Sequence, residues 1–555
     1  MKTHIGNRQH YTRRDMLSVV AGLGAVALIR PGRASAQTAK PPERPTGQVI
    51  IGFSQEPTVF NPLMPGIEVD QGVHWNLFSP LWGAGPDGQL VPYLAAEVPS
   101  LANGGISEDG LRWRIKLRSD VKWHDGKPFS AEDVKFTIDL INNPKFRAGI
   151  RSGHELVRDI TIHGPTEISW RIERAFAPYM SILATTFIVP KHVLEAAADP
   201  NMAPFNNAPI GTGPFKWVSR LAGDNIVLAA NEDYFGEGPY LERLIFKYIP
   251  DLTVLFTQFQ TGDIDYIGLQ GISPDRYEDA TKLADRTIVP APMPSVENLG
   301  FNLGRPQFKD RAVREALYLA VDKKSIIETI YYGLPEPTES FLPHQSWAYN
   351  GDLPRHEYNP DKAKALLDEA GWRPGAGGVR EKDGVRLSFA NSTTAGNHVR
   401  EQTQQFLQQT WRDIGVELKI NNLPAAVMWG DFFRLSEFDT VMVGTSFVIG
   451  SDPESRENFS SRAIPVTGGS GWNTMQYSNP EVDRLLDEGG ASADPAKRRE
   501  IYVKMQGIIR HELPFLPFFQ YALVEGTKKD LVGLRPNVNL LSNAWNAGSW
   551  YWAKS

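Results

Sequence analysis

The residues with the chemistry for covalent catalysis do not form a complete catalytic motif. Cysteine is absent, which excludes thiol nucleophiles, disulfides and zinc–thiolate sites. The segment Gly468-Gly469-Ser470-Gly471-Trp472 approaches the nucleophile elbow of serine hydrolases, but Trp472 stands where the last glycine belongs. None of the 11 histidines forms a His-x-x-x-His or His-Glu-x-x-His pair, the helix motif of zinc hydrolases. The sequence therefore predicts no enzymatic activity, and neither a metal site nor a cofactor.

Aromatic side chains in loops are the stronger indication of function. Five tryptophans lie in segments rich in glycine or proline: Trp75, Trp82, Trp347, Trp472 and Trp545. In a cleft, such rings stack on sugars, on peptide side chains or on other planar groups, while a few polar atoms fix the orientation of the ligand. For each single tryptophan, ordinary packing in a core is the favoured alternative.

The first 36 residues have the features of an export signal. Thr12-Arg13-Arg14-Asp15-Met16-Leu17 is a twin-arginine pattern, and the uncharged run 16–29 follows it. That run is shorter than the roughly 20 residues that a membrane-spanning helix needs. Ala34-Ser35-Ala36 supplies the small residues of a cleavage site. The pattern predicts a twin-arginine signal peptide cleaved after about Ala36, with an N-terminal membrane anchor as the alternative.

Charge and composition indicate a globular, acidic mature protein. The chain has 555 residues, of which 41% are hydrophobic and 22% charged. These values are those of an ordinary globular chain, and the length corresponds to about three domains. The net charge of the full sequence is −6, and removal of the basic leader makes the remainder more acidic. An acidic exported protein is a poor partner for nucleic acid or for an anionic membrane surface.

The elements that must position any site alternate between strands and helices. Val49-Ile50-Ile51-Gly52-Phe53 predicts a short apolar strand, and residues 111–117 alternate apolar and basic side chains as a half-buried strand does. Ser130 and Asp133 predict a reciprocal helix cap. Further strands are expected at 226–230, 244–249 and 416–420, and further helices after Asp310, Asn359-Pro360 and Asn479-Pro480. The fold class is therefore mixed α/β.

An ordered set of motifs gives these elements a family resemblance. Residues 109–118 (DGLRWRIKLR) and 121–134 (VKWHDGKPFSAEDV) resemble the signature of the family 5 extracellular solute-binding proteins. These are receptors of ABC importers for dipeptides, oligopeptides, nickel and related solutes. Four more segments match the family in the same order, and the resemblance extends from about Val49 to Val532. These segments are 209–215 (PIGTGPF), 231–235 (NEDYF), 260–265 (QTGDID) and 358–363 (YNPDKA).

The resemblance implies an α/β, two-lobed periplasmic binding protein fold of type II (cluster C) with an extra α+β domain. By motif position, residues 37–75, 209–293 and 522–555 form lobe I, residues 76–208 form the extra domain, and residues 294–521 form lobe II. Two hinge crossings are then expected near Pro294–Asn298 and Phe519–Val524. Closure about such a hinge forms contacts on both lobes together, so the ligand selects the closed state.

The resemblance also implies the function. We expect an extracytoplasmic, periplasmic receptor that captures a peptide or similar small polar solute and delivers it to separate ABC transporter permease and ATPase subunits. The protein is expected to be a monomer that uses no cofactor and binds no nucleic acid. An oligosaccharide, an opine-like conjugate or a metal chelate is the alternative ligand within the family. An exported hydrolase that reuses the cleft is a less favoured alternative.

Candidate ligand-binding residues are expected on loops at strand ends near the hinge. Lobe I contributes three candidates after its opening strand, and lobe II contributes five on two loops, with the Trp472 ring and Phe447 as facing walls. The candidates are Gln55, Glu56, Phe60, Thr445, Ser446, Phe447, Trp472 and Asn473. The motif at 211–214 (GTGP) is expected to form a tight return to lobe I, without a role in ligand binding.

One stretch departs from the pattern of the peptide-binding members. According to the resemblance, these hold the ammonium of the peptide with an aspartate in the loop after the second-lobe strand. Here the corresponding residues 446–453 (SFVIGSDP) contain a single acid, Asp452, which better matches the Asp-Pro pair of the family. The apolar run 447–449 cannot offset a buried ammonium. This disfavours a dipeptide and leaves longer peptides and the alternative ligands open.

Overall fold

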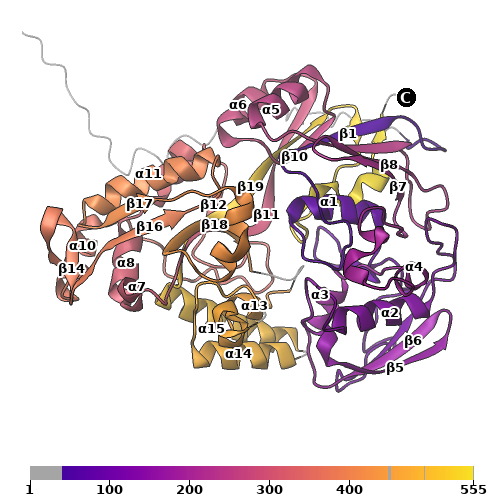
Figure 1. The fold of residues 1–555 in the computed structure, drawn as a ribbon, viewed down its shortest axis with the longest axis horizontal. Helices are drawn as coiled ribbons and strands as arrows, with labels where there is room; N and C mark the ends of the chain where they lie inside the picture. Colours follow the sequence, from indigo (N-terminus) through magenta and orange to yellow (C-terminus); the bar gives the residue numbers. More distant parts are fainter. Residues whose placement is uncertain (1–39, 448–451, 470, 493, 554–555) are drawn as a thin grey trace, which may run out of the picture. The chain divides into compact units, whose positions relative to one another are not determined.

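The structure of this protein is a computed structural model that describes residues 40–447, 452–469, 471–492 and 494–553 (Figure 1). Every described helix and strand belongs to one compact unit, Pro41–Ser555. The expected signal peptide, residues 1–36, lies outside the described residues. Among the described residues, no helix has the length and apolar character that crossing a membrane requires.

An eleven-stranded mixed sheet is the largest element of this unit. Ten strands follow the order β17-β16-β18-β11-β19-β10-β1-β9-β8-β7, and β12 pairs with β19. Their bounds are β1 (Gln48–Phe53), β7 (Phe215–Leu221), β8 (Asn225–Ala230), β9 (Arg243–Tyr248), β10 (Tyr266–Ile272), β11 (Arg286–Phe301), β12 (Glu336–Pro337), β16 (Ser388–Ser392), β17 (Glu417–Ile420), β18 (Thr440–Ser446) and β19 (Phe515–Lys528). The four strands predicted at 49–53, 226–230, 244–249 and 416–420 are confirmed as β1, β8, β9 and β17.

Two long strands, β11 and β19, connect the two halves of this sheet. They pair with each other in antiparallel over most of their length. The register shifts between Pro292 and Val296 and again between Glu297 and Asn298. From Ser295 to Phe301, β11 also pairs with β18, whereas β19 pairs with β10 over residues 524–527. In Figure 1 both strands run between the half with β16–β18, here the second lobe, and the half with β1 and β7–β10, here the first lobe. Such irregularities bend a sheet locally.

Helix α1 (Glu68–Leu77) has a central place in the first lobe, and Asp70 fixes its start. The Asp70 carboxylate accepts hydrogen bonds from the backbone N–H groups of Thr58, Val59 and Ile67 at 2.7, 3.0 and 2.8 Å. One side chain therefore ties the loop after β1 to the first turn of the helix. The lobe is completed by α5 (Leu252–Thr261), α6 (Tyr277–Thr281), β20 (Leu531–Val532), η10 (Asn543–Ser549) and β21 (Tyr551–Trp552).

The extra domain has a core of its own around a three-stranded sheet. The rings of Trp113 and Trp170 stack with centroids 6.3 Å apart between paired strands. Ser130 and Asp133 cap the main helix reciprocally, which confirms the predicted helix start. The alternating exposure of the first strand confirms the pattern read at 111–117. The elements are β4 (Arg112–Lys116), β5 (Val157–Gly164), β6 (Glu167–Ile172), α2 (Ala131–Asn142), α3 (Tyr179–Leu183), α4 (Lys191–Leu194), β2 (Trp82–Ala84) and β3 (Leu90–Pro92).

The second lobe covers its strands with helices that begin where the sequence predicts. The side chains of Asp310, Asn359 and Asn479 each accept a backbone N–H of the first turn that follows, which confirms all three predicted starts. These starts open α8 (Arg311–Leu319), α10 (Pro360–Glu369) and α14 (Pro480–Ala491). The other helices include α7 (Pro306–Lys309), α9 (Lys323–Ser325), α11 (His398–Arg412), α12 (Ala425–Val427), α13 (Arg456–Phe459) and α15 (Pro495–Glu512), beside the short hairpin β13–β15 (373–374, 380–382 and 385–386).

Candidate ligand-binding site

A buried ion pair lies where β11 crosses into the second lobe. Arg400 of α11 donates from Nε to Glu297 Oε1 at 2.7 Å and from Nη2 to Glu297 Oε2 at 2.8 Å. Glu297 is fully buried and Arg400 nearly so. Burial opposes the charge of Arg400, but the attraction of Glu297 prevails and raises its pKa above the ordinary value. The bidentate geometry satisfies the hydrogen-bonding groups of both charged side chains. Loss of either partner would leave an uncompensated buried charge and destabilise the fold.

A glycine lets neighbouring strands close tightly around this pair. A Cβ atom on Gly444 of β18 would lie 3.3 Å from Arg400 Nη2 and 3.4 Å from both Glu297 Oε2 and Tyr521 Cδ2. The Arg400 guanidinium carbon also lies 6.0 Å from the centre of the Tyr521 ring, on β19. The crossing strands, α11 and the end of β18 therefore meet at one place beside the hinge.

Two carboxyl groups of the first lobe, Glu68 and Glu525, have no basic partner in the part of the chain that the structure describes. Glu68 is the first residue of α1, and its Oε1 is shielded from solvent with no hydrogen-bond partner among the described residues. Glu525 of β19 is 3% exposed and accepts a hydrogen bond from Asn543 Nδ2 at 2.9 Å. The Tyr266 hydroxyl also bonds Glu525. Both carboxyl groups thus lie where α1, β10, β19 and η10 meet.

Burial raises the pKa of both carboxyl groups. Burial, reinforced by the charge of Glu525, raises the pKa of Glu68 to about 8. Burial raises the pKa of Glu525 to about 7, although the hydrogen bonds from Asn543 and Tyr266 oppose the shift. Glu68 also acts on Tyr521, whose pKa responds to Arg400 and Glu297 of the second lobe.

The structure commits two of the three predicted first-lobe residues to contacts within that lobe. Glu56 Oε1 accepts hydrogen bonds from Arg220 Nη2 at 2.6 Å and from the backbone N–H of Gly223 at 3.0 Å. Phe60 is 1% exposed and packs on Trp217, with ring centres 4.8 Å apart. The prediction of a cleft position for Phe60 is thus replaced by a core position. Gln55 is exposed, and its role stays a prediction.

The predicted second-lobe residues separate into surface and core. Thr445 and Ser446, at the end of β18, are half-buried, and Thr445 Oγ1 accepts a hydrogen bond from Asn298 Nδ2 at 3.1 Å. Phe447 is 1% exposed and stacks on Phe459 and Phe515, so it belongs to the core instead of forming a wall opposite Trp472.

Of the neighbouring residues Trp472 and Asn473, the first lies on the surface and the second is buried. Asn473 is fully buried, and its side chain bonds the backbone at Ser460 and Tyr477. It therefore supports the loop and has no free polar atom to offer a ligand from this position. The Trp472 ring is 48% exposed, which excludes the core packing considered for it. A ligand contact at Trp472 stays a prediction.

Asp452, the single acid of the departing loop, is not available to a ligand. Its two carboxylate oxygens accept hydrogen bonds from Arg498 Nη1 and Nη2 at 2.8 and 2.6 Å, and its side chain is 7% exposed. Residues 448–451 of this loop lie outside the described residues. The second lobe therefore neutralises this acid internally.

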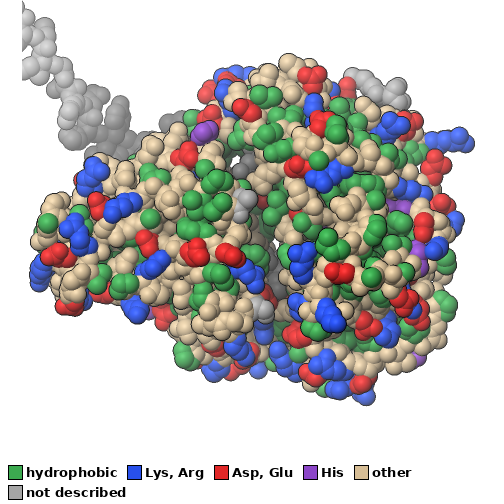
Figure 2. Space-filling model, viewed as in Figure 1, with side chains coloured by type: hydrophobic (Ala, Val, Ile, Leu, Met, Phe, Trp, Pro, Cys, Tyr) green, Lys and Arg blue, Asp and Glu red, His purple; other side chains and the backbone are tan. Residues whose placement is uncertain are grey.

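The two halves touch again at a distance from the crossing strands. The backbone N–H of Ala177, between β6 and α3, donates to the carbonyl of Gly490 in α14 at 2.8 Å. Arg456 Cζ lies 4.8 Å from the centre of the Phe176 ring. In Figure 1, α3 approaches α13 and α14 there, and Figure 2 shows a furrow between the two halves. The furrow is thus bounded at one end by the crossing strands β11 and β19 and at the other by the Ala177–Gly490 contact. A ligand held in the furrow would be enclosed between the two halves.

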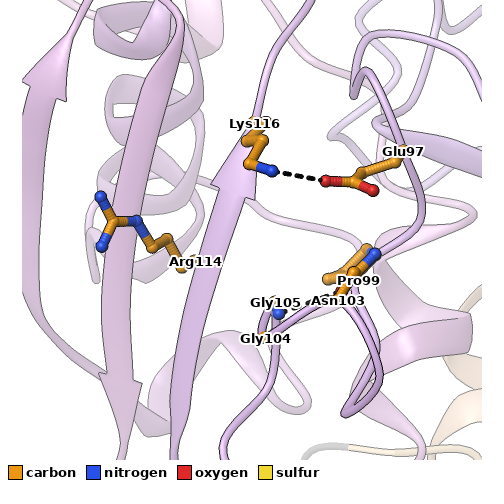
Figure 3. Close-up of a pocket in the computed structure, with 7 residues that line it drawn as sticks. All are labelled: Glu97, Pro99, Asn103, Gly104, Gly105, Arg114 and Lys116. Carbon is orange, nitrogen blue, oxygen red and sulfur yellow. Dashed lines mark hydrogen bonds and ion pairs between the residues drawn. The ribbon is translucent and has the colours of Figure 1, made fainter.

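A surface pocket on the extra domain does not compete with this site. It lies beside β4 and has a volume of about 30 Å³, which is room for no more than two or three water molecules. Figure 3 shows that Lys116 and Glu97 pair across it, with Nζ 2.9 Å from Oε1. Among the described residues, no group of three or more His, Cys, Asp or Glu side chains is placed to hold a metal ion.

Sequence reasoning did not find the groups that carry the strongest electrostatics. Glu297 falls inside the predicted crossing 294–298, but its partner Arg400 is 103 positions away along the chain. Glu68 sits three residues after Pro65 in a loop-to-helix segment without a motif. The available signal was the position of Glu68 directly after the loop that follows the opening strand.

Comparison with known proteins supports the resemblance read from the motifs. The family model described as bacterial extracellular solute-binding proteins, family 5, matches residues 89–464. The oligopeptide-binding protein AppA of Bacillus subtilis is 31% identical over 483 residues, which are 84% of this chain and 85% of that protein.

Two solved structures share the whole architecture. AppA from Bacillus subtilis in complex with a nonapeptide has a TM-score of 0.83 at 29% identity, covering 93% of this chain and 100% of that chain. NikZ from Campylobacter jejuni in complex with Ni(L-His) has a TM-score of 0.82 at 28% identity, covering 91% of this chain and 99% of that chain.

Proposed function

We infer the ligand class and the binding mechanism of this protein from its membership of family 5 of the bacterial extracellular solute-binding proteins. The family consists of receptors rather than enzymes, and the protein is the substrate-binding receptor of an ABC importer. Its fold is the two-lobed periplasmic binding protein fold with an extra domain. A permease and an ATPase on separate chains are the partners that this role requires, and we propose that the receptor meets them as a monomer that leaves its solute unchanged.

The proposed ligand is a peptide longer than a dipeptide. The complex of AppA with a nonapeptide supports this ligand class, and the pairing of Asp452 with Arg498 argues against a short peptide held at that loop. A metal chelate is the second candidate, because NikZ, a relative of similar likeness, is seen with Ni(L-His). An oligosaccharide and an opine-like conjugate remain alternative small polar solutes.

The proposed mechanism is closure of two lobes about β11 and β19. The observation that carries it is the combination of two crossing strands with register shifts at Pro292–Val296 and a second interlobe contact at Ala177–Gly490. We place lobe I at 37–75, 209–293 and 522–555, the extra domain at 76–208 and lobe II at 294–521. Of the predicted site residues, Gln55, Thr445, Ser446 and Trp472 keep exposed or half-buried side chains for ligand contact.

Mass spectrometry of the purified protein under native conditions tests the receptor function. The expected result is a complex whose mass exceeds that of the mature chain by one small solute, which is released unchanged on denaturation. Addition of excess peptide should displace that solute, because one site holds both. A chemically altered solute after incubation would instead indicate the hydrolase alternative.

We propose export as a folded protein through the twin-arginine pathway, with cleavage after about Ala36 and release into the periplasm. The pattern at Thr12–Leu17 supports this route. Exchange of Arg13 and Arg14 for lysine is expected to leave uncleaved precursor in the cytoplasm, as measured by fractionation and immunoblotting. Normal periplasmic levels of the double variant would show that another route exports the protein.

A further inference from the structure

We propose that a cavity between α8, α10 and α15 of the second lobe is a second binding site, which takes a small anion with a carboxylate or phosphate group. The cavity is lined by residues within 311–319, 354–362 and 507–513, and its volume is about 290 Å³. Small-molecule sites begin at roughly this size, about 300 Å³. The inference goes beyond the proposed receptor function, because these helices belong to one lobe (Figure 1), whereas the proposed solute cleft lies between two.

The first observation is a positively charged cluster behind the cavity, in which two cations share one carboxylate. Lys323 Nζ lies 2.6 Å from Glu339 Oε1, and Arg510 Nε donates to Glu339 Oε2 at 2.8 Å. Burial lowers the pKa of Lys323 to about 8, so the ammonium still carries its charge at pH 7. The third side chain bonded to Glu339 is the neutral Tyr318 hydroxyl. The cluster therefore holds an excess of one positive charge.

Arg510 is the member of this cluster that can offer that charge to a ligand. Lys323 Nζ is already surrounded by four acceptors, among them Glu339 and the Tyr318 hydroxyl. Arg510 lines the cavity, and within the described part of the chain its Nη1 and Nη2 make no hydrogen bond. Its guanidinium carbon lies 4.9 Å from the centre of the Tyr318 ring, which supports it from one face. Two free donors of one guanidinium match two oxygens of a carboxylate or phosphate.

The second observation is an uncompensated arginine on the same lining. Two other cations of the lining have partners of their own, in the pairs Arg311–Glu315 at 2.7 Å and Lys362–Glu357 at 2.8 Å. Arg355 is exposed, and its side chain has neither an ion pair nor a hydrogen bond to any residue that the structure describes. The adjacent His356 is anchored to the cluster, because its Nε2 lies 2.8 Å from the carbonyl oxygen of Tyr318. Arg355 therefore adds a second positive charge at the rim of the cavity.

The third observation is a glycine that keeps the cavity open. Gly507 lines the cavity from the interior of α15, three residues before Arg510 and hence on the same face of the helix. Glycine inside a helix weakens that helix. A Cβ atom on Gly507 would meet no atom within 4 Å beyond the backbone of its own helix. The residue thus leaves free space beside the guanidinium, which a side chain would fill.

The competing interpretation is a hollow of the surface that holds only water. Titration calorimetry of the ligand-free mature protein at pH 7 distinguishes the two, with inorganic phosphate, malonate and citrate as probes and with the ionic strength held constant by sodium chloride. The expected result is saturable binding of one anion per chain. The order of the three dissociation constants then shows whether phosphate or carboxylate oxygens fit the site better.

Three variants locate the site, and a fourth is the control. Arg510→Lys keeps the charge but loses the two free donors, and we expect the dissociation constant to rise at least about tenfold. Gly507→Leu keeps every charge and fills the cavity, and we expect a rise of similar size. Arg355→Gln should raise the constant roughly two- to fivefold, as is usual for an exposed charge. Arg434→Gln removes an exposed arginine of the second lobe that does not line the cavity, and it should leave the constant unchanged.

Folding of the variants is checked by their melting temperatures without added anion. Gly507→Leu should melt at or above the temperature of the wild type, because leucine is the better helix former, so its loss of binding cannot come from unfolding. Absence of saturable binding of all three anions to the wild type would overturn the site. Unchanged affinity in either Gly507→Leu or Arg510→Lys would place the anion elsewhere and overturn it as well.

Discussion

Replacement of Arg400 with methionine is expected to lower the free energy of unfolding by about 3–5 kcal/mol. Removal of one partner of a buried ion pair leaves the other charge without compensation, and such changes have effects of this size. The charge left behind is the fully buried Glu297 carboxylate, which now receives two hydrogen bonds from Arg400. Chemical denaturation of the ligand-free protein at pH 7 measures the loss.

The double variant Arg400→Met, Glu297→Gln is the control for this prediction. It removes both charges, so it is expected to be clearly more stable than Arg400→Met alone. A single variant with wild-type stability would show that Glu297 finds water or another partner once Arg400 is gone. The site at the crossing strands would then be wetter than the structure indicates.

Replacement of Gly211 with alanine is expected to lower the free energy of unfolding by about 3 kcal/mol or more. A Cβ atom at this position would lie 1.8 Å from the carbonyl oxygen and 2.7 Å from the carbonyl carbon of Leu77, at the end of α1. The atoms that would have to move are backbone atoms at the buried end of a helix. Relief of the clash would therefore cost much of the free energy of folding. Differential scanning calorimetry measures the effect, and the ligand affinity of the folded fraction should stay unchanged.

Gly164→Ala is the matched control, because a Cβ atom there meets no atom within 4 Å and the backbone is not in a left-handed conformation. Its stability should stay within about 0.5 kcal/mol of the wild type. Equal stability of the Gly211 and Gly164 variants would contradict the close approach. It would also remove the structural explanation of the Gly211-Thr212-Gly213-Pro214 motif.

The sequence allowed a good prediction of those parts of the fold that local chemistry decides. The caps at Ser130, Asp310, Asn359 and Asn479 act within one helical turn, so the residues themselves define where the helices begin. The central strand β1 is an uninterrupted apolar run because both neighbours are parallel strands and the sheet is covered there. The ordered family motifs then supplied the two-lobed architecture, which no local pattern contains.

The candidate site was harder to predict, because its groups come from distant parts of the chain. Phe447 follows a strand in an apolar run, and that pattern is the same for a cleft wall and for a core residue; the rings of Phe459 and Phe515 decide between them. The raised pKa of Glu68 is caused first by its burial and then by Glu525, 457 positions further along the chain. Partners at this separation are fixed by the tertiary fold and leave no periodicity to read.

The distance between the two lobes in solution tests the central claim, closure on a ligand, most directly. The chain has no cysteine, so Ile150→Cys and Val466→Cys place two spin labels selectively, at positions that are 51% and 41% exposed. The label at position 150 marks the extra domain, close to Ser152, which contacts Glu457 of the second lobe. The label at position 466 marks the second lobe itself. Double electron–electron resonance is recorded without ligand and with a saturating concentration of an oligopeptide whose binding has been verified by titration calorimetry. Closure predicts a broad distribution that shortens and narrows with the peptide; an identical distribution in both states would contradict it.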